Sequence, residues 1–174
     1  MIPPVQIPIQ IKKIIDALLL MPHPSEGGFY RETFRSEETV FTEAGSRSLS
    51  TSIYFLVLGG APTELHCLPG PETFHYYMGD PLELFLYDGE NQPEVKRLGP
   101  VSDQDARPQL VVPGGVWQAA RVVPGGTYSL VGTTMSPGFD FADYKGLARE
   151  EWSRLYPNAK KAMRRFYDDK EAVF

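Results

Sequence analysis

Residues 60–79 read GAPTELHCLPGPETFHYYMG, and this stretch decides the fold that the sequence predicts. The Pro-Gly-Pro run at residues 69–71 enforces a turn between two short strands. Side chains alternate along a strand, so His66 and Leu68 face the same way. If the two strands pair, His66 and Glu72 point into one cavity. An imidazole and a carboxylate that converge there can bind a metal or move a proton.

The composition predicts one domain of the mainly β class. The 174 residues are enough to bury a substantial core. Sixteen glycines and sixteen prolines are spread along the chain, and with nine tyrosines and ten phenylalanines they favour many short strands joined by turns. The net charge of -5 comes from mixed acidic and basic residues without a basic stripe, which argues against a nucleic-acid partner.

The expected location is a reducing, cytoplasmic compartment. The single cysteine, Cys67, excludes an internal disulfide, and alternation turns it away from His66 as a buried structural thiol. The apolar run at residues 14–21 is too short to span a bilayer, and Asp16 interrupts it. It also lacks the cationic start and small-residue cleavage site of a signal peptide. We therefore expect a soluble protein without a membrane partner.

Turn and periodicity signals organise the rest of the chain. The first eight residues contain three prolines and predict an extended arm, and apolar spacing predicts a helix over residues 9–21. Turn signals then recur about every 8–14 residues as far as Gly138, as in an antiparallel barrel. The expected strands are residues 29–34, 50–58, 73–78, 82–87, 95–98, 110–112, 117–123 and 128–135, with a polar loop at 37–48 and helices at 147–155 and 159–167.

Two motifs resemble those of the cupin superfamily. The first cupin motif is glycine, five residues, His-x-His, three or four residues, glutamate, six residues and glycine, and residues 60–79 match this spacing with Leu68 in place of the second histidine. Residues 113–118, PGGVWQ, resemble the second motif, Pro-x-Gly-x-x-His, with Gln118 in the histidine place. The resemblance implies an antiparallel double-stranded β-helix, that is, a jelly-roll or cupin barrel. It leaves His66, Glu72 and Gln118 as an incomplete set of metal ligands.

Further segments are similar to one family of small cupins, often labelled cupin type 5 or a domain of unknown function. The similar segments are residues 23–24, 26–33, 53–56, 74–82, 112–120, 128–132 and 136–141. The resemblance implies a jelly-roll homodimer, related in fold to deoxysugar epimerases and isomerases, and it implies no settled reaction. We therefore expect an N-terminal arm and helix at residues 1–22, a cupin barrel at 23–144 and C-terminal helices at 145–174, together forming a single domain.

Alternation predicts which side chains face the interior of the barrel. The inward-facing set comprises His66, Glu72, Phe74, Tyr76 and Gln118. His75 and Tyr77 then face away, unless a bulge after Pro71 reverses the phase. The family resemblance implies a histidine three residues after the glutamate, so His75 remains a candidate catalytic residue. His23 lies between two prolines and is predicted to be a turn residue.

The first functional hypothesis is metal-independent acid/base chemistry on a sugar or nucleotide sugar, as in an isomerase or epimerase. His66 would be the general base, oriented by Glu72, and Tyr76 or Tyr128 would return the proton from the other side. The predicted ligand-binding residues are Tyr30, Arg31, Phe74, Trp117 and Gln118. For Arg31 the alternative is a surface ion pair, and for Trp117 it is packing in the core.

Two other functional classes stay open. The barrel could bind a metabolite without turning it over, with His66, Glu72 and Gln118 as polar anchors. It could also be a metal-dependent oxygenase or lyase, the usual role of complete cupin motifs. A metal site needs at least three good ligands, so Leu68 and Gln118 count against this class and we expect that no cofactor is required. Exposed sheet edges and the proline-rich arm favour a homodimer.

Overall fold

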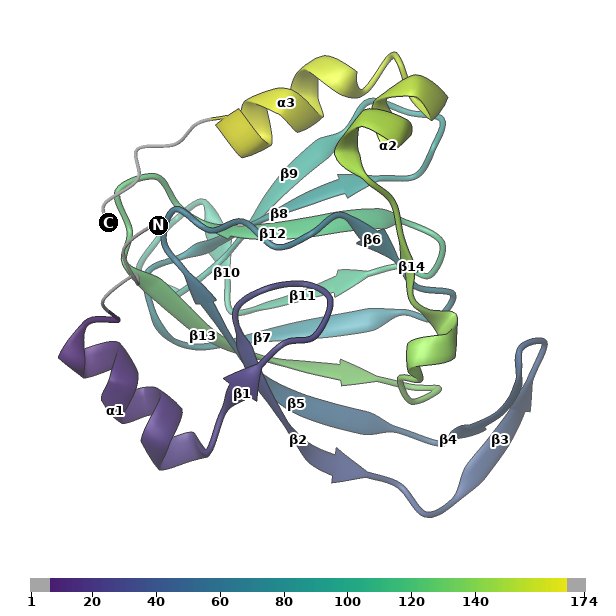
Figure 1. Ribbon diagram of the computed structural model, residues 1–174, viewed down its shortest axis with the longest axis horizontal. Helices are drawn as coiled ribbons and strands as arrows, with labels where there is room; N and C mark the ends of the chain where they lie inside the picture. The colour runs from purple at the N-terminus through teal and green to yellow at the C-terminus, as the bar shows by residue number, and fades with distance from the viewer. Residues whose placement is uncertain (1–6, 169–174) are drawn as a thin grey trace, which may run out of the picture.

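Two six-stranded sheets face each other in the computed structural model, which describes residues 7–168 (Figure 1). The first sheet has the order β1 (Met21–Pro22), β2 (Phe29–Arg35), β5 (Thr51–Leu58), β13 (Tyr128–Met135), β7 (Glu72–Gly79) and β11 (Gln109–Val112). The second has the order β10 (Ala106–Arg107), β9 (Glu94–Leu98), β8 (Leu82–Tyr87), β12 (Trp117–Val122), β6 (His66–Cys67) and β14 (Lys145–Gly146). Apart from the parallel pair β9–β10, neighbouring strands in both sheets are antiparallel. The predicted antiparallel jelly roll is confirmed.

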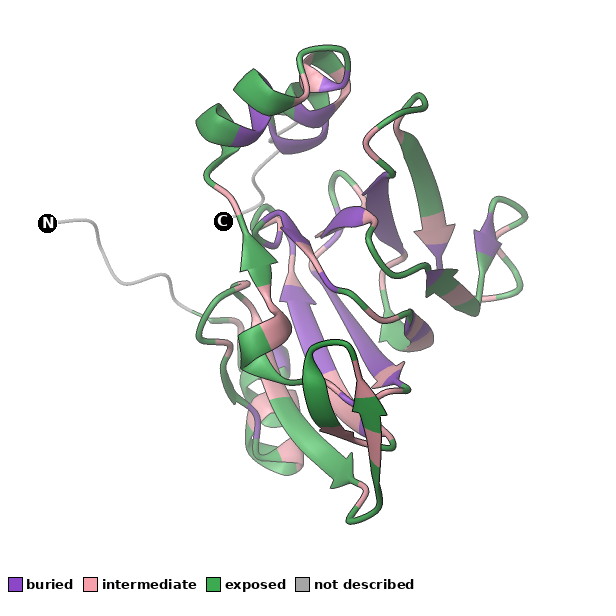
Figure 2. Ribbon diagram, turned by 90° about the vertical axis from the view of Figure 1, so that its right-hand side faces the viewer, coloured by how far each residue is buried: buried purple, intermediate pink, exposed green. Residues whose placement is uncertain are grey.

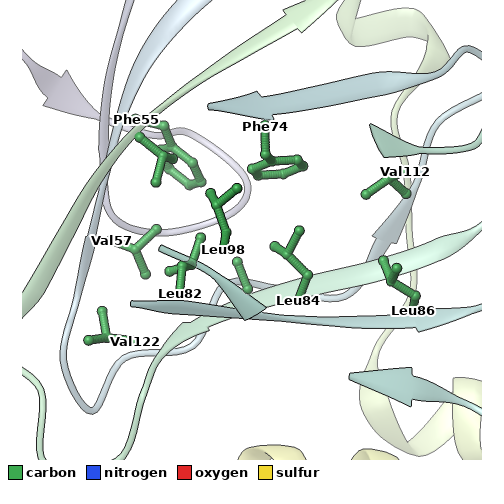
Figure 3. Packing of buried hydrophobic residues seen from close by; sticks show 11 residues of the cluster. Phe55, Val57, Phe74, Leu82, Leu84, Leu86, Leu98, Val112 and Val122 are labelled. Atoms are coloured by element: carbon green, nitrogen blue, oxygen red, sulfur yellow. The ribbon is translucent and has the colours of Figure 1, made fainter. Parts of the chain in front are cut away.

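The space between the sheets is filled by apolar side chains from both of them. Phe55 and Phe74 come from the first sheet, and Leu82, Leu84 and Leu86 come from β8 of the second (Figure 3). Each such side chain stabilises the fold by roughly 1.5–3 kcal/mol relative to an exposed position. Phe74 thus faces inward as alternation predicts, but it is a member of this core.

Helices cover the outer face of each sheet. The helix α1 (Ile9–Leu18) packs Ile11 onto Leu56 and Leu130 of the first sheet. The helices α2 (Arg149–Leu155) and α3 (Lys160–Asp168) place Trp152 and Phe166 against the second sheet. Buried residues are concentrated in the central strands, whereas the outer helices and edge strands carry the exposed ones (Figure 2). None of the described helices is long and apolar enough to cross a membrane.

Two predicted boundaries differ from the structure. The predicted helix over residues 9–21 ends at Leu18, because Leu19 adopts a left-handed conformation with φ of 53° and the chain then enters β1. The predicted loop at 37–48 is a hairpin of β3 (Thr39–Thr42) and β4 (Gly45–Ser48). None of its strand residues is buried, and its large apolar residues Val40 and Phe41 are adjacent, so the sequence shows no apolar alternation there. Most of the predicted arm, residues 1–6, lies outside the described residues.

The strands β6 and β7 do not pair with each other, which corrects the expected hairpin at residues 66–79. β6 pairs with β12 and β14, and β7 pairs with β13 and β11. The turn at 69–71 carries the chain from the second sheet to the first. His66 and Glu72 therefore approach the interior from opposite walls.

Candidate acid/base site

A cavity of about 220 Å³ lies against the inner side of the first sheet. Its polar and charged lining residues are His23, Glu26, Tyr30, Glu32, Arg35, Thr51, Glu72 and Thr133. Its apolar lining residues are Ile53, Phe55, Leu68, Met135, Phe139 and Phe141. The barrel interior is thus divided between a solid core and a mainly apolar cavity with a few titratable groups, as is usual for a small-molecule site.

The loop between β1 and β2 carries two of the titratable groups into this cavity. Gly27 and Gly28 have φ of 84° and 68°, a region that favours glycine. A Cβ atom on Gly28 would lie 2.5 Å from the carbonyl oxygen of Leu56, so only glycine allows the loop to press against β5. The Nδ1 atom of His23 accepts a hydrogen bond of 2.9 Å from the backbone N–H of Glu26, which fixes the two side chains relative to each other.

Glu26 lies between two imidazoles. Its Oε1 atom is 3.8 Å from Nε2 of His23 and 3.7 Å from Nε2 of His66. Burial raises the pKa of Glu26 to about 8, because the charged carboxylate loses its hydration. Glu26 therefore holds a proton at neutral pH and can release it when a charge or a hydrogen-bond donor approaches.

Hydrogen bonds assign different tautomers to the two histidines. The Nδ1 atom of His66 is 3.0 Å from the carbonyl oxygen of Glu64, which only accepts, so Nδ1 carries the hydrogen and Nε2 presents its lone pair to Glu26. The Nδ1 atom of His23 accepts from backbone N–H groups, so its Nε2 carries the hydrogen. Glu26 thus faces one acceptor and one donor, and a small shift would bring either into hydrogen-bond distance.

Both imidazoles are neutral at pH 7. Burial, together with the repulsion between protonated His23 and a protonated His66, lowers the pKa of His23 to about 4. Burial also lowers the pKa of His66, although Glu72 and the carbonyl of Glu64 oppose the shift. The ring of Tyr144 stacks on His66 with centroids 5.1 Å apart and an angle of 19°, which helps to exclude water from the imidazole.

Glu72 and Gln118 are joined across the barrel. The Nε2 atom of Gln118 donates to Oε2 of Glu72 at 2.8 Å, and Gln118 is paired with His66 in the second sheet. Burial and the nearby Glu26 raise the pKa of Glu72, while His66, Thr133 and Gln118 oppose the shift. The structure thus brings together the predicted imidazole, acid and amide, but Glu72 lines the cavity whereas His66 and Gln118 do not.

Three predicted site residues lie elsewhere in the first sheet. Tyr128 is buried under α1 on the outer face, so it is not placed to return a proton to the cavity. Tyr76 packs at the edge of the interior core, and its hydroxyl donates to the carbonyl of Gly79 at 2.6 Å. His75 faces outward and its Nε2 lies 3.2 Å from Oγ1 of Thr134. The bulge in β7 falls at Tyr77, after His75, so it does not reverse the phase at His75.

Two predicted ligand-binding residues lie outside the barrel. Trp117 faces the C-terminal helices, where its Nε1 donates to the hydroxyl of Tyr156 at 3.1 Å. Arg31 faces α1 and donates to the carbonyl of Leu18 at 3.2 Å. Tyr30 does line the cavity, and its ring is 4.6 Å from that of His23.

The main omission of the sequence reasoning is Glu26, together with the role of His23. The signal that could have found them is the segment His23-Pro-Ser-Glu26-Gly-Gly, in which two titratable residues precede a glycine pair. His23 does lie in a turn, as predicted, but its ring faces the cavity.

The residues present do not fit the metal site of a complete cupin motif. Leu68 is buried in the cavity wall and has no ligand atom, and the amide nitrogen of Gln118 faces Glu72. The Nε2 atom of His23 carries a hydrogen and cannot coordinate in that tautomer. Within residues 7–168 no three histidine, cysteine, aspartate or glutamate side chains are grouped to hold a metal ion. The predicted set of His66, Glu72 and Gln118 is therefore incomplete as a metal site.

A jelly roll with an interior site that contains the histidine and glutamate of the first motif defines a cupin. The family model described as "Cupin superfamily (DUF985)" matches residues 12–147. The chain belongs to this family, which confirms the resemblance found in the sequence.

Solved structures support the same assignment. A hypothetical protein from Leishmania major is 31% identical with a TM-score of 0.82, over 88% of this chain and 96% of that one. A protein from Shewanella oneidensis is 33% identical with a TM-score of 0.78, over 88% and 94%. A mutant of Bacillus subtilis oxalate decarboxylase is 15% identical with a TM-score of 0.54, over 83% and 36%, and shares the fold alone. Comparison with curated protein sequences gave no match.

Proposed function

We propose that this cupin is a small-molecule enzyme that transfers protons without a metal, as an isomerase or epimerase acting on a sugar or a similar polar metabolite. The observation that carries the proposal is the position of Glu26. Its carboxyl group faces the cavity and lies between a neutral imidazole that accepts and a neutral imidazole that donates. A carboxyl with a pKa of about 8 can serve as an acid or as a base near neutral pH.

The roles of the site residues follow from their access to the cavity. Glu26 is the catalytic residue, because it can touch a bound substrate. His66 is a positioning residue, since it lies behind Glu26 and accepts or returns its proton. Tyr30 takes the role first given to Tyr76 or Tyr128, because it is the tyrosine among the lining residues and its hydroxyl is a proton donor.

The cavity favours a ligand of about the size of one sugar ring. Its volume of about 220 Å³ lies below the usual range for drug-sized ligands, roughly 300–1,000 Å³. The nucleotide part of a nucleotide sugar would have to lie outside it. Apolar residues such as Ile53 and Met135 would contact the ring faces, while Glu72 would orient polar groups of the ligand.

Deuterium exchange tests the proposal. Wild-type protein is incubated with a panel of monosaccharides in deuterated buffer, and incorporation at carbon is followed by NMR. We expect catalysed exchange into at least one sugar and a loss of roughly 100-fold or more in Glu26→Gln, in keeping with the usual contribution of a general acid or base. The matched control is Glu150→Gln, the same substitution at an exposed residue of α2. If Glu26→Gln exchanges as fast as wild type, the proposed role of Glu26 is wrong. If neither protein catalyses exchange, the proposed activity on sugars is wrong.

A further inference from the structure

We propose that the ligand of this cavity is a small organic cation, such as a metabolite with a protonated amine, held between the carboxyl groups of Glu26 and Glu72 and the aromatic rings of the cavity wall. This inference concerns the same cavity as the proposed function and names the charge class of its substrate. It depends on three observations: the charge of the lining residues, the free oxygen atoms of Glu26 and the aromatic wall.

The lining of the cavity has more carboxyl groups than cationic side chains, and its cationic side chain is already paired with one of them. Its carboxyl groups belong to Glu26, Glu32 and Glu72, and its cationic side chain is Arg35. Arg35 is bound in a two-pronged ion pair to Glu32, with bonds of 2.9 Å from Nε and 2.7 Å from Nη2. Within the part of the chain that the structure describes, Glu26 and Glu72 have no lysine or arginine partner.

The carboxyl group of Glu26 also lacks the hydrogen bonds that Glu72 has. Gln118 and Thr133 form hydrogen bonds with Glu72, whereas Oε1 of Glu26 faces the two imidazole nitrogens at 3.7 and 3.8 Å, beyond hydrogen-bond distance. Among residues 7–168 no donor lies within hydrogen-bond distance of its carboxyl oxygens. A buried acid without donors is costly unless a ligand supplies them. Glu26 therefore has room for the N–H groups of an ammonium ion.

Aromatic rings form the wall that would surround the cation. Tyr30, Phe55 and Phe141 have ring centroids 4.6, 5.8 and 6.3 Å from that of His23. Phe139 joins them through an edge contact with Phe141 at 4.9 Å. The faces of such rings attract cations, and the attraction grows when water is excluded. An organic cation uses both the carboxyl groups and this wall, whereas a bare metal ion gains little from the wall and lacks a complete ligand set.

A charge-matched pair of probes tests the inference. Binding of cyclohexylamine and of cyclohexanol, which have the same ring and number of heavy atoms, is measured by calorimetry at about pH 8.5, where the amine and Glu26 are both charged. We expect wild type to prefer the amine roughly tenfold or more. Glu26→Gln should lose most of this preference, and Phe141→Leu, at a half-exposed position, should reduce it. Glu150→Gln should keep it.

Each outcome decides for or against the cation. Equal binding of the two probes, or an amine preference that survives Glu26→Gln unchanged, would overturn the inference. Displacement of cyclohexylamine by stoichiometric Mn²⁺ or Zn²⁺ would also overturn it, since the cavity would then be a metal site. Deuterium exchange into neutral sugars would leave the proposed function standing even if the cation inference fails. The exchange test is therefore repeated with amino sugars, which carry a protonated amine. An amine preference without exchange into either neutral or amino sugars would support the cation and contradict the enzyme.

Discussion

The Nε2 atom of His66 lies 3.7 Å from Oε1 of Glu26, although the two residues come from opposite walls of the barrel. His66 belongs to β6 in the second sheet, and Glu26 belongs to the loop that precedes β2 in the first. The Nε2 atom of His66 is therefore placed as an acceptor near a proton on Glu26. The distance between the two residues depends on how the two sheets pack against each other. The following predictions test this dependence and the chemistry that it supports.

The first prediction concerns stability against pH. Glu26 has a pKa of about 8 in the folded state and an ordinary value of 4.5, so between these values the folded state binds the extra proton and stability falls as pH rises. His23, with its pKa lowered to about 4 from 6.5, acts in the opposite direction, but only below pH 6.5. From pH 6.5 to 8 we therefore expect the free energy of unfolding to fall by about 2 kcal/mol more in wild type than in Glu26→Gln.

Urea denaturation at a series of pH values measures this difference. The buried Glu72 remains in both proteins, but the part of its raised pKa that comes from Glu26 is lost in Glu26→Gln, so the measured difference includes the coupling between the two carboxyl groups. Parallel stability curves for wild type and Glu26→Gln across this range would show that the carboxyl of Glu26 is ionised in the folded state at neutral pH.

The second prediction concerns the bond between Gln118 and Glu72. Replacing Gln118 by Leu removes the 2.8 Å donor and leaves a buried carboxyl less satisfied, which should cost about 1–3 kcal/mol. Gln109→Leu, at an exposed position in β11, is the matched control and should change the free energy of unfolding by less than about 0.5 kcal/mol. A loss of the same size in both variants would show that the bond contributes nothing specific.

The third prediction concerns the missing metal ligands. The double variant Leu68→His with Gln118→His restores both histidines of the cupin motifs beside His66 and Glu72. We expect it to bind about one divalent transition metal ion per chain after dialysis, because four imidazole and carboxylate ligands then converge. Metal content is measured by mass spectrometry on protein without a histidine tag, with the Leu68→His single variant as control. Failure of the double variant to retain metal would mean that the barrel cannot bring these positions together.

The fourth prediction separates two adjacent glycines. Both Gly27 and Gly28 have positive φ, so alanine at either is strained by about 1–2 kcal/mol. Only at Gly28 does the added Cβ collide with backbone, at 2.5 Å from Leu56, whereas at Gly27 it meets nothing within 4 Å. Gly28→Ala should therefore lose clearly more stability than Gly27→Ala, and it should also slow the exchange reaction by displacing Glu26. Equal losses in the two variants would contradict this account of the loop.

Much of the fold could be predicted because it depends on local patterns. The strand Tyr128–Met135 was predicted with its observed bounds, since turn residues delimit it on both sides. Alternation also placed His66, Glu72 and Gln118 on inward faces, because each lies on a regular strand. The same rule placed Phe74 inward but could not show that the core fills that part of the barrel.

The rest depends on contacts between distant segments. The sequence alone allows Tyr128 to be a proton donor, but in the structure α1 covers it on the outer face of the sheet. No local sequence pattern predicts which face of a sheet a helix covers. Glu26 lies in a loop, where alternation does not apply, and its neighbour His66 is forty residues away in the chain. The hairpin of β3 and β4 was missed because none of its strand residues is buried and its large apolar residues, Val40 and Phe41, are adjacent instead of alternating.

The stacking of Tyr144 on His66 has a consequence for how the site arises during synthesis. Glu26 leaves the ribosome early, whereas the ring that helps to dehydrate its surroundings follows more than one hundred residues later. Until that ring is added, one face of the His66 imidazole, 3.7 Å from Glu26, is left uncovered. The dry surroundings that raise the pKa of Glu26 are therefore complete only after Tyr144 has been added, and a polypeptide that stops before this residue would lack the ring that covers His66.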